Sequence, residues 1–371
     1  MFDPRILKLA DVLVGFSCNV QKGENVLIEN IGGCDDLARA LVKRVYEAGA
    51  NPFLWLGDKA LSRELLLHCN VEQLKTRAEV DAALMSKMQA YIGIRGGSNA
   101  CEEADVPASR INDYATYYWT PVHGNIRVAK TKWVILRYPS PSMAQMANMS
   151  TEGFEDYFFN VCTLDYGKMD RAMDALVRRM EATDRVHIVG VGTDLSFSIK
   201  GLPAIKCAGK VNIPDGEVFT APVRESVNGV VSFTAPSLYQ GVRHERVKLV
   251  FKDGKIIDCD GSAPEAMRRV FDTDAGARYV GEFAIGVNPY IHHAMLDTLF
   301  DEKIAGSFHF TPGMCYDECP NGNKSAIHWD LVCIQTPAFG GGEIWFDDTL
   351  VRKDGAFVPA DLHCLNPENL K

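Results

Sequence analysis

Little in this 371-residue sequence points to nucleic acid or to a membrane as a partner. Positive charge is scarce, since 39 Lys and Arg residues stand against 48 Asp and Glu residues and leave a formal net charge of −9. An acidic chain without a basic stripe is not expected to bind nucleic acid or an anionic lipid surface. No uninterrupted apolar run approaches the ~18 residues that a membrane span requires. These absences exclude classes of partner but say nothing about chemistry.

Signals for secretion are also scarce. The first residues, Met1-Phe2-Asp3-Pro4, lack the basic and apolar regions of a signal peptide. The 11 cysteines are an odd number, and only Cys315 and Cys319 lie close together. This usage is typical of reduced thiols, so we expect a cytoplasmic protein. A structural zinc site built from Cys315, Cys319 and His328 is a weaker hypothesis, because no convincing fourth ligand follows.

The composition is that of a globular protein, with 47% hydrophobic and 23% charged residues. The length fits two domains of about 150 residues each. In the first half, short apolar strands alternate with amphipathic helices. We expect strands at 25–28, 52–56, 91–94 and 133–136, and helices beginning near Pro4, at Asp35, over about 62–87 and over 151–183. This alternation predicts βαβ units with a mostly parallel sheet.

The pattern changes at Arg185, where a strand-rich half begins. Strands at 247–251 and 255–258 flank Asp253-Gly254, which is a hairpin signal. We therefore predict an α/β fold with an N-terminal βαβ domain over residues 1–183 and a β-rich α+β domain over residues 184–371. The stretch Gly190–Asp194 lacks the third glycine of a dinucleotide-binding loop, so no nucleotide cofactor is expected.

Histidines and carboxylates concentrate in the second half. His328 and Asp330 lie two residues apart in a stretch, 326–332, that resembles a strand, where residues i and i+2 share a face. They are suited either to bind a metal ion together or to form a simple His–Asp hydrogen bond with each other. His309 also lies on a short apolar strand, and burial there would require a polar partner. Together the two histidines favour a metal site.

Three glutamates extend this set. Glu282 enters an apolar strand, an environment that favours a paired or metal-bound carboxylate. Glu217 follows a Pro-Asp-Gly turn, so it is either a metal ligand or an exposed residue at the start of a strand. Glu302 is either a metal ligand or a solvated turn residue. Two imidazoles with several carboxylates suit Zn²⁺, Co²⁺ or Mn²⁺, and the excess of carboxylates suggests two ions that share a bridging ligand.

The sequence resembles a known family, the thermophilic metallo-aminopeptidases of the aminopeptidase T and aminopeptidase S type. Similarity extends more weakly over nearly the whole chain. Five blocks in the family's order carry the resemblance: Asn212–Phe219, Gly281–Gly286, Asp301–Gly306, His309 with Gly313 and Tyr316, and His328–Leu331. The chain departs from the family in being somewhat shorter and in the compact turn over residues 317–323, which puts substrate preference in question.

The resemblance implies a dinuclear metal centre in the C-terminal domain, with peptides as substrates, and a homodimer with an enclosed cavity. By residue it implies five metal ligands and one additional glutamate near the metals: Glu217, Glu282, His309, His328 and Asp330, with Glu302 as the additional one. Tyr316 matches the family's active-site tyrosine.

The activity implied is that of a metal-dependent aminopeptidase, which hydrolyses the N-terminal residue from peptides. Two metal ions would polarise the scissile carbonyl and convert a bound water into a hydroxide nucleophile. Glu217 or Glu282 would bridge the ions or handle the proton of the water. Acidic groups near the cavity would attract the α-ammonium group of the substrate.

Two alternatives remain open at this level. A mononuclear non-haem Fe(II) ring-cleaving dioxygenase has a similar fold, and two histidines with Asp330 would form its facial triad. In that enzyme, a histidine is expected where this chain has Glu282, which favours the two-metal hydrolase. The other alternative is a metal-binding protein that has lost catalysis.

Overall fold

The computed structural model describes residues 3–371 and divides into two compact units. The first comprises the described residues up to Thr163 together with Gly209–Ile213, and the second comprises Leu164–Ala208 and Pro214–Lys371. Within residues 3–371, none of the helices combines the length and the apolar character needed to cross a membrane.

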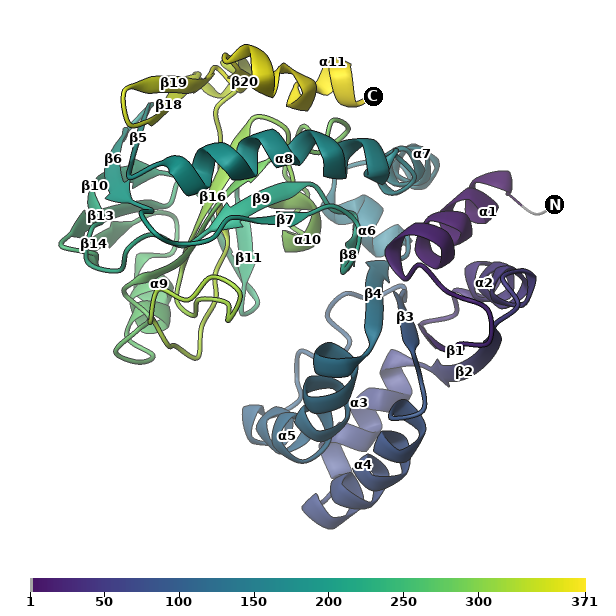
Figure 1. Ribbon diagram of the computed structural model, residues 1–371. Coiled ribbons are helices and arrows are strands. Elements are labelled where there is room, and N and C mark those ends of the chain that lie inside the picture. Colours follow the sequence, from purple (N-terminus) through teal and green to yellow (C-terminus); the bar gives the residue numbers. More distant parts are fainter. Residues whose placement is uncertain (1–2) are drawn as a thin grey trace. The chain divides into compact units, whose positions relative to one another are not determined.

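The first unit is built on a five-stranded sheet of order β2-β1-β3-β4-β8 (Figure 1). Its strands are β1 (Asn25–Ile31), β2 (Asn51–Gly57), β3 (Ala90–Arg95), β4 (Lys132–Arg137) and β8 (Asn212–Ile213). Every neighbouring pair is parallel. The mostly parallel sheet predicted from the alternation of strands and helices is thereby confirmed.

Helices connect the consecutive strands, as parallel pairing requires, and two further helical segments precede β1. They are α1 (Pro4–Asp11), η1 (Val12–Ser17), α2 (Asp35–Glu47), α3 (Lys59–His68), α4 (Val71–Met85), α5 (Ala108–Tyr114), η2 (Ala115–Val128), α6 (Pro141–Met146) and α7 (Thr151–Cys162). The single helix expected over about 62–87 is two helices. The side chain of Asn70 accepts a hydrogen bond from the Gln73 amide, which starts α4 with a new N-cap.

The second unit contains two larger antiparallel sheets and a two-stranded one. The eight-stranded sheet has the order β14-β13-β10-β6-β5-β18-β19-β20. Its strands are β5 (Arg185–Gly190), β6 (Thr193–Ser198), β10 (Asn228–Ser232), β13 (Lys248–Lys252), β14 (Lys255–Asp260), β18 (Gly342–Phe346), β19 (Thr349–Lys353) and β20 (Ala356–Phe357). The hairpin expected at Asp253-Gly254 connects β13 to β14, with Asp253 at a φ of 49°.

The five-stranded sheet of the second unit has the order β17-β16-β15-β9-β7. Its strands are β7 (Ile205–Cys207), β9 (Glu217–Thr220), β15 (Val280–Gly286), β16 (Ser307–Pro312) and β17 (Leu331–Ile334), while β11 (Ser237–Tyr239) pairs only with β12 (Val242–His244). The helical segments are α8 (Tyr166–Ala182), α9 (Pro264–Phe271), α10 (Thr298–Asp301), η3 (Pro337–Phe339), η4 (Ala360–Leu365) and α11 (Pro367–Leu370).

Aromatic side chains join the two larger sheets of the second unit. The ring of Phe197, on β6, lies 5.0 Å from that of Phe283 and 5.1 Å from that of Phe310, measured between centroids. Phe251, on β13, lies 5.7 Å from Phe310. Strand side chains alternate between faces, so β15 and β16 bury phenylalanines on this face and are free to present polar residues on the other.

Helix α8 belongs to the second unit, although the sequence pattern places it before a boundary near Thr183. It contacts β7, β9 and η4, and it lies along the two strands in Figure 1. Its methionines, Met169, Met173 and Met180, are fully buried or nearly so. A helix whose apolar face packs on a sheet of the second unit is part of that unit's core, which moves the division to Leu164.

Candidate metal centre

One face of the sheet β17-β16-β15-β9-β7 carries most of the predicted site residues. Glu217 lies opposite Gly286, and His309 lies opposite Ala284. Directly opposed residues share a face of a sheet, so Glu217, Glu282 and His309 point to the same side. Glu282 and Ala284 flank Phe283, whose ring packs in the core on the other side. The prediction that Glu282 and His309 lie on strands is confirmed.

Glu302 reaches this face from the end of α10 because a glycine permits close approach. A Cβ atom at Gly286 would lie 2.4 Å from the carbonyl oxygen of Ile304 and 3.0 Å from that of Glu302. The chain over residues 302–304 therefore passes directly over β15. The Glu302 side chain is only 14% exposed, so its interpretation as a solvated turn residue is wrong.

His328 and Asp330 come together, but not as residues of one strand. Strand β17 begins only at Leu331, and His328 forms an isolated bridge with Gly313. The strand expected over 326–332 is thus shorter, because this segment pairs with the turn after β16 rather than with a regular strand. The two side chains nevertheless lie together, with His328 Nε2 3.2 Å from Asp330 Oδ1.

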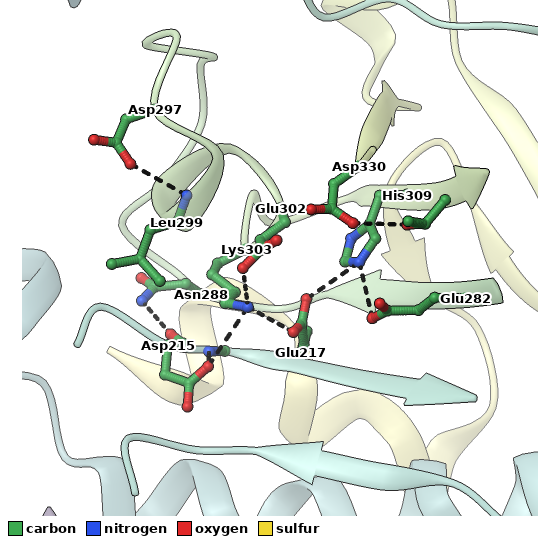
Figure 2. A network of polar contacts seen from close by, with 12 residues as sticks. Asp215, Glu217, Glu282, Asn288, Asp297, Leu299, Glu302, Lys303, His309 and Asp330 are labelled. Atoms are coloured by element: carbon green, nitrogen blue, oxygen red, sulfur yellow. Dashed lines mark hydrogen bonds and ion pairs between the residues drawn. The ribbon is translucent and has the colours of Figure 1, made fainter. Parts of the chain in front are cut away.

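The six predicted ligands form two groups of three. Glu217, Glu302 and His309 form one group, and Glu282, His328 and Asp330 form the other; in each, the potential ligand atoms lie within 4.8 Å of one another. We call them the inner group and the outer group, respectively. Glu282 connects them, since its Oε1 lies 3.2 Å from His309 Nε2 and its Oε2 lies 3.2 Å from His328 Nε2. Figure 2 shows the inner group with Glu282 and Asp330.

The site is buried and strongly charged. Glu217, Glu282 and His309 are 5%, 3% and 0% exposed. Burial raises the pKa of Glu217 to about 7. Burial opposes protonation of His309, but the carboxylates of Glu217 and Glu282 outweigh it and raise its pKa to about 9. The site thus holds more negative charge than its protein partners neutralise.

The donor set fits divalent metal ions. Imidazole and carboxylate groups are the ligands that Zn²⁺, Co²⁺ and Mn²⁺ accept. The buried Glu217 Oε2 and His309 Nδ1 atoms have no hydrogen-bond partner. A buried carboxylate oxygen without a donor is costly, and a bound cation would satisfy it.

Neighbouring groups orient the outer group. The Thr311 hydroxyl donates a 2.7 Å hydrogen bond to Asp330 Oδ1. His328 Nδ1 donates to the carbonyl oxygen of Met314 over 2.9 Å, which leaves Nε2 to face the carboxylates. The Tyr316 ring centroid lies 4.9 Å from that of His328 and 5.5 Å from that of Phe219. Tyr316 is 46% exposed, so one side of its ring is open to solvent.

Sequence reasoning missed three residues of the site: Lys303, Asp215 and Thr311. The fully buried Lys303 forms ion pairs with Glu217 and Glu302. Asp215 was interpreted only as part of a turn, but it is 1% exposed. Thr311 had a usable signal, because it follows His309 by two residues on the same strand and therefore shares its face.

The alternative zinc site is not formed among residues 3–371. None of the groups of potential metal ligands in this part of the chain contains Cys315 or Cys319. Cys315 Sγ instead donates to the carbonyl oxygen of Asn323 over 3.1 Å, and Cys319 Sγ accepts the Ala221 amide over 3.0 Å.

Gly313→Ala should disturb the outer group. Gly313 has a φ of 114°, and a Cβ there would lie 2.1 Å from the Ile327 carbonyl oxygen, so the bridge to His328 should be displaced. We expect a lower melting temperature and metal affinity reduced at least about tenfold, as for other losses of ligand support. Gly322→Ala is the matched control, because Gly322 also has a positive φ, 83°, with no atom within 4 Å of the added Cβ. Equal metal affinity in the two variants would contradict this role.

Comparison with known proteins finds aminopeptidases that are similar to this chain over most of its length. It is 25% identical over 412 residues to Aminopeptidase PepS from Streptococcus thermophilus, covering 96% of this chain and 97% of that protein. It is 28% identical over 380 residues to Aminopeptidase T from Thermus thermophilus, covering 89% of this chain and 92% of that protein.

Two solved structures share the fold over nearly the whole chain. Wild-type AmpT from Thermus thermophilus matches with a TM-score of 0.81 at 24% identity, covering 97% of this chain and all of that one. The 2,5-dihydroxypyridine dioxygenase from Pseudomonas putida KT2440 matches with a TM-score of 0.62 at 14% identity, covering 96% and 98%. The two scores favour the AmpT architecture.

The family of this chain is assigned from a match to a family sequence model. The model described as thermophilic metalloprotease (M29) matches residues 2–352, which include all six predicted ligands and Tyr316. The chain belongs to the thermophilic metalloprotease (M29) family.

Proposed function

We propose that this protein is a metal-dependent aminopeptidase that removes the N-terminal residue from peptides at a centre of two Zn²⁺, Co²⁺ or Mn²⁺ ions. The inner group would hold one ion and the outer group the other. Glu282 would connect the two, since its oxygens face both histidines. The observation that carries this proposal is the meeting of two His–carboxylate groups at one buried glutamate.

The metal ions would supply Lewis acidity and a lowered pKa for a water molecule. The protein's own residues position the remaining chemistry. Thr311 and the Met314 carbonyl fix the orientations of Asp330 and His328. Glu217 would hold an ion through Oε2, which has no hydrogen-bond donor, and a carboxylate of the centre would receive the proton of the attacking water.

The charge of the site suits a substrate with a free amino terminus. Five carboxylates belong to the site. Those of Asp215, Glu217 and Glu302 surround Lys303 (Figure 2), and those of Glu282 and Asp330 lie beside His328. A site that concentrates negative charge attracts cations. The α-ammonium group of a peptide is the cation adjacent to the first peptide bond, so a carboxylate oxygen of the site that binds no metal ion would favour cleavage at the N-terminus.

The ring-cleaving dioxygenase is the weaker alternative. Its solved structure supports a shared fold, at 14% identity. A facial triad uses two histidines and one carboxylate at a single iron. Here each histidine lies in a separate group with two carboxylates. The four carboxylates together carry more negative charge than one Fe(II) ion needs.

The proposal is tested by a panel of aminoacyl reporter amides, each with a free and an acetylated amino group. Metal-free protein is assayed alone and with Zn²⁺, Co²⁺, Mn²⁺ or Fe²⁺. We expect hydrolysis of free-amine substrates only, with any of the first three ions. Equal rates on acetylated substrates would contradict aminopeptidase specificity, and oxygen consumption with Fe²⁺ and a dihydroxypyridine would support the alternative.

Tyr316→Phe should lower kcat by about 10²–10³-fold, the usual cost of losing one donor to a developing oxyanion. The half-exposed tyrosine packs on the His328 ring, and this proposal gives its hydroxyl the role of donor to the carbonyl attacked at the centre. Phenylalanine keeps this ring packing, and we expect normal folding, two bound metals and a much smaller change in KM. Tyr46→Phe, at an exposed tyrosine of the first unit, is the control. Wild-type turnover in Tyr316→Phe would leave the ring with a packing role alone.

The homodimer remains a prediction, and it rests on the family resemblance. Light scattering at micromolar concentration should give about twice the chain mass of 41.0 kDa. A mass near 41.0 kDa would contradict the dimer. The expectation of a cytoplasmic protein likewise remains a prediction, which cell fractionation would test.

A further inference from the structure

Lys303 is a buried cation inside the candidate metal centre. Its side chain is 1% exposed, and its Nζ lies 2.5 Å from Glu217 Oε1 and 2.6 Å from Glu302 Oε1. Asp215 Oδ1 lies 3.7 Å away. Figure 2 shows this ammonium group between the three carboxylates. Lysine is almost never fully buried unless it is paired, so these contacts hold it where it is.

The ammonium group of Lys303 contacts one carboxylate oxygen of each of the two inner glutamates. It takes Oε1 of Glu217, whereas Oε2 of the same carboxylate lies 3.5 Å from His309 Nε2 and lacks a hydrogen-bond donor. One oxygen of Glu217 is therefore used by the lysine, and the other remains available beside the histidine. A third group of potential ligands lies in the same region and consists of Cys207, Asp215 and Glu217. Lys303 already supplies the positive charge for this group, because it contacts Asp215 and Glu217.

The two groups consequently differ in charge. With neutral histidines and ionised carboxylates, the outer group carries two negative charges from Glu282 and Asp330. The inner group also has two carboxylates, but Lys303 contacts both of them. Repulsion between a buried lysine and a divalent ion a few ångströms away is large even at an effective dielectric constant of about 20.

We propose that Lys303 is a positioning residue that makes the two metal subsites unequal, with the outer group binding the first ion tightly and the inner group binding the second ion more weakly. The lysine holds Glu217 and Glu302 in place when the inner group is empty of metal, and it opposes the ion that binds there. This inference rests on the proposed two-ion centre.

Calorimetric titration of the metal-free protein with Co²⁺ tests this inference without measuring activity. Wild type should show two binding steps. Lys303→Met keeps the side-chain length and removes the charge, so the weaker step should tighten at least tenfold, or about 1.4 kcal/mol. The metal-free variant should also melt at a lower temperature, because two buried carboxylates lose their partner. Lys303→Arg retains the charge and should leave the second step weak.

A second measurement uses the wild-type protein alone. Crystals prepared with one equivalent of Co²⁺ should show anomalous scattering at Glu282, His328 and Asp330 first, which keeps the inference testable if Lys303→Met fails to fold. Equal occupancy of both groups, or an unchanged weak step in Lys303→Met, would overturn the role of Lys303 and leave the two-ion centre intact. Binding of only one ion at any concentration would overturn both.

Discussion

Glu282→Gln should lower kcat by about 10³-fold or more without unfolding the protein. Glu282 is the one side chain of the centre whose two oxygens each lie 3.2 Å from a different histidine. Glutamine keeps the size of the side chain and removes the charge that would connect two cations. A catalytic metal ion supplies several kcal/mol of transition-state stabilisation, and each 1.36 kcal/mol corresponds to tenfold in rate.

The measurement is kcat together with metal content by elemental analysis. Glu225→Gln is the matched control, because Glu225 is an exposed glutamate of the same unit in a surface pair with Arg224, and such pairs contribute little. Glu282→Gln should still fold, since the phenylalanines on the opposite face of β15 and β16 are unchanged, and its melting temperature should be close to that of the metal-free wild-type protein. Full metal content with wild-type turnover would remove Glu282 from the centre.

Removing the metal ions should abolish peptidase activity, and adding Zn²⁺, Co²⁺ or Mn²⁺ should restore it. Buried carboxylates gathered without sufficient cations are unfavourable. Burial, and to a smaller extent the neighbouring carboxylates of Glu302 and Glu282, raise the pKa of Glu217 to about 7. We therefore also expect the metal-free protein to unfold at a lower temperature than the reconstituted one, by the linkage between binding and stability.

Ca²⁺ is the control ion for reconstitution. It prefers six to eight oxygen ligands, whereas each group here includes an imidazole nitrogen. We expect Ca²⁺ to leave the protein inactive. Full activity in a sample shown to be free of transition metals would contradict a metal-dependent mechanism.

Much of the fold follows from local patterns in the sequence. The apolar stripe of α2, with Leu37, Leu41 and Val45 buried, predicts a helix packed on a sheet. The break between α3 and α4 was not predicted because Asn70 also fits a continuous helix. In the structure Cys69 and Asn70 have extended backbones, and the Asn70 side chain accepts the Gln73 amide, which starts the new helix. The division of the chain at Leu164 depends on which sheet α8 packs against, and that contact is long-range.

The candidate site residues were predicted from residue type and resemblance, but the residues that contact them in the structure were not. Strand alternation places Glu282 and His309 on one face, and it would also have placed Thr311 there. Lys303 looks like a solvated residue in Asp-Glu-Lys, because nothing local shows that the segment is buried. Its burial depends on Gly286, a glycine on a distant strand that lets this segment approach.

The most direct test of the two-ion centre is a crystal structure of the metal-loaded protein with anomalous scattering, supported by metal analysis of the same sample. The account predicts two Zn²⁺, Co²⁺ or Mn²⁺ ions per chain, one at Glu217, Glu302 and His309 and one at Glu282, His328 and Asp330. A single iron ion held by the two histidines and Asp330 would contradict it.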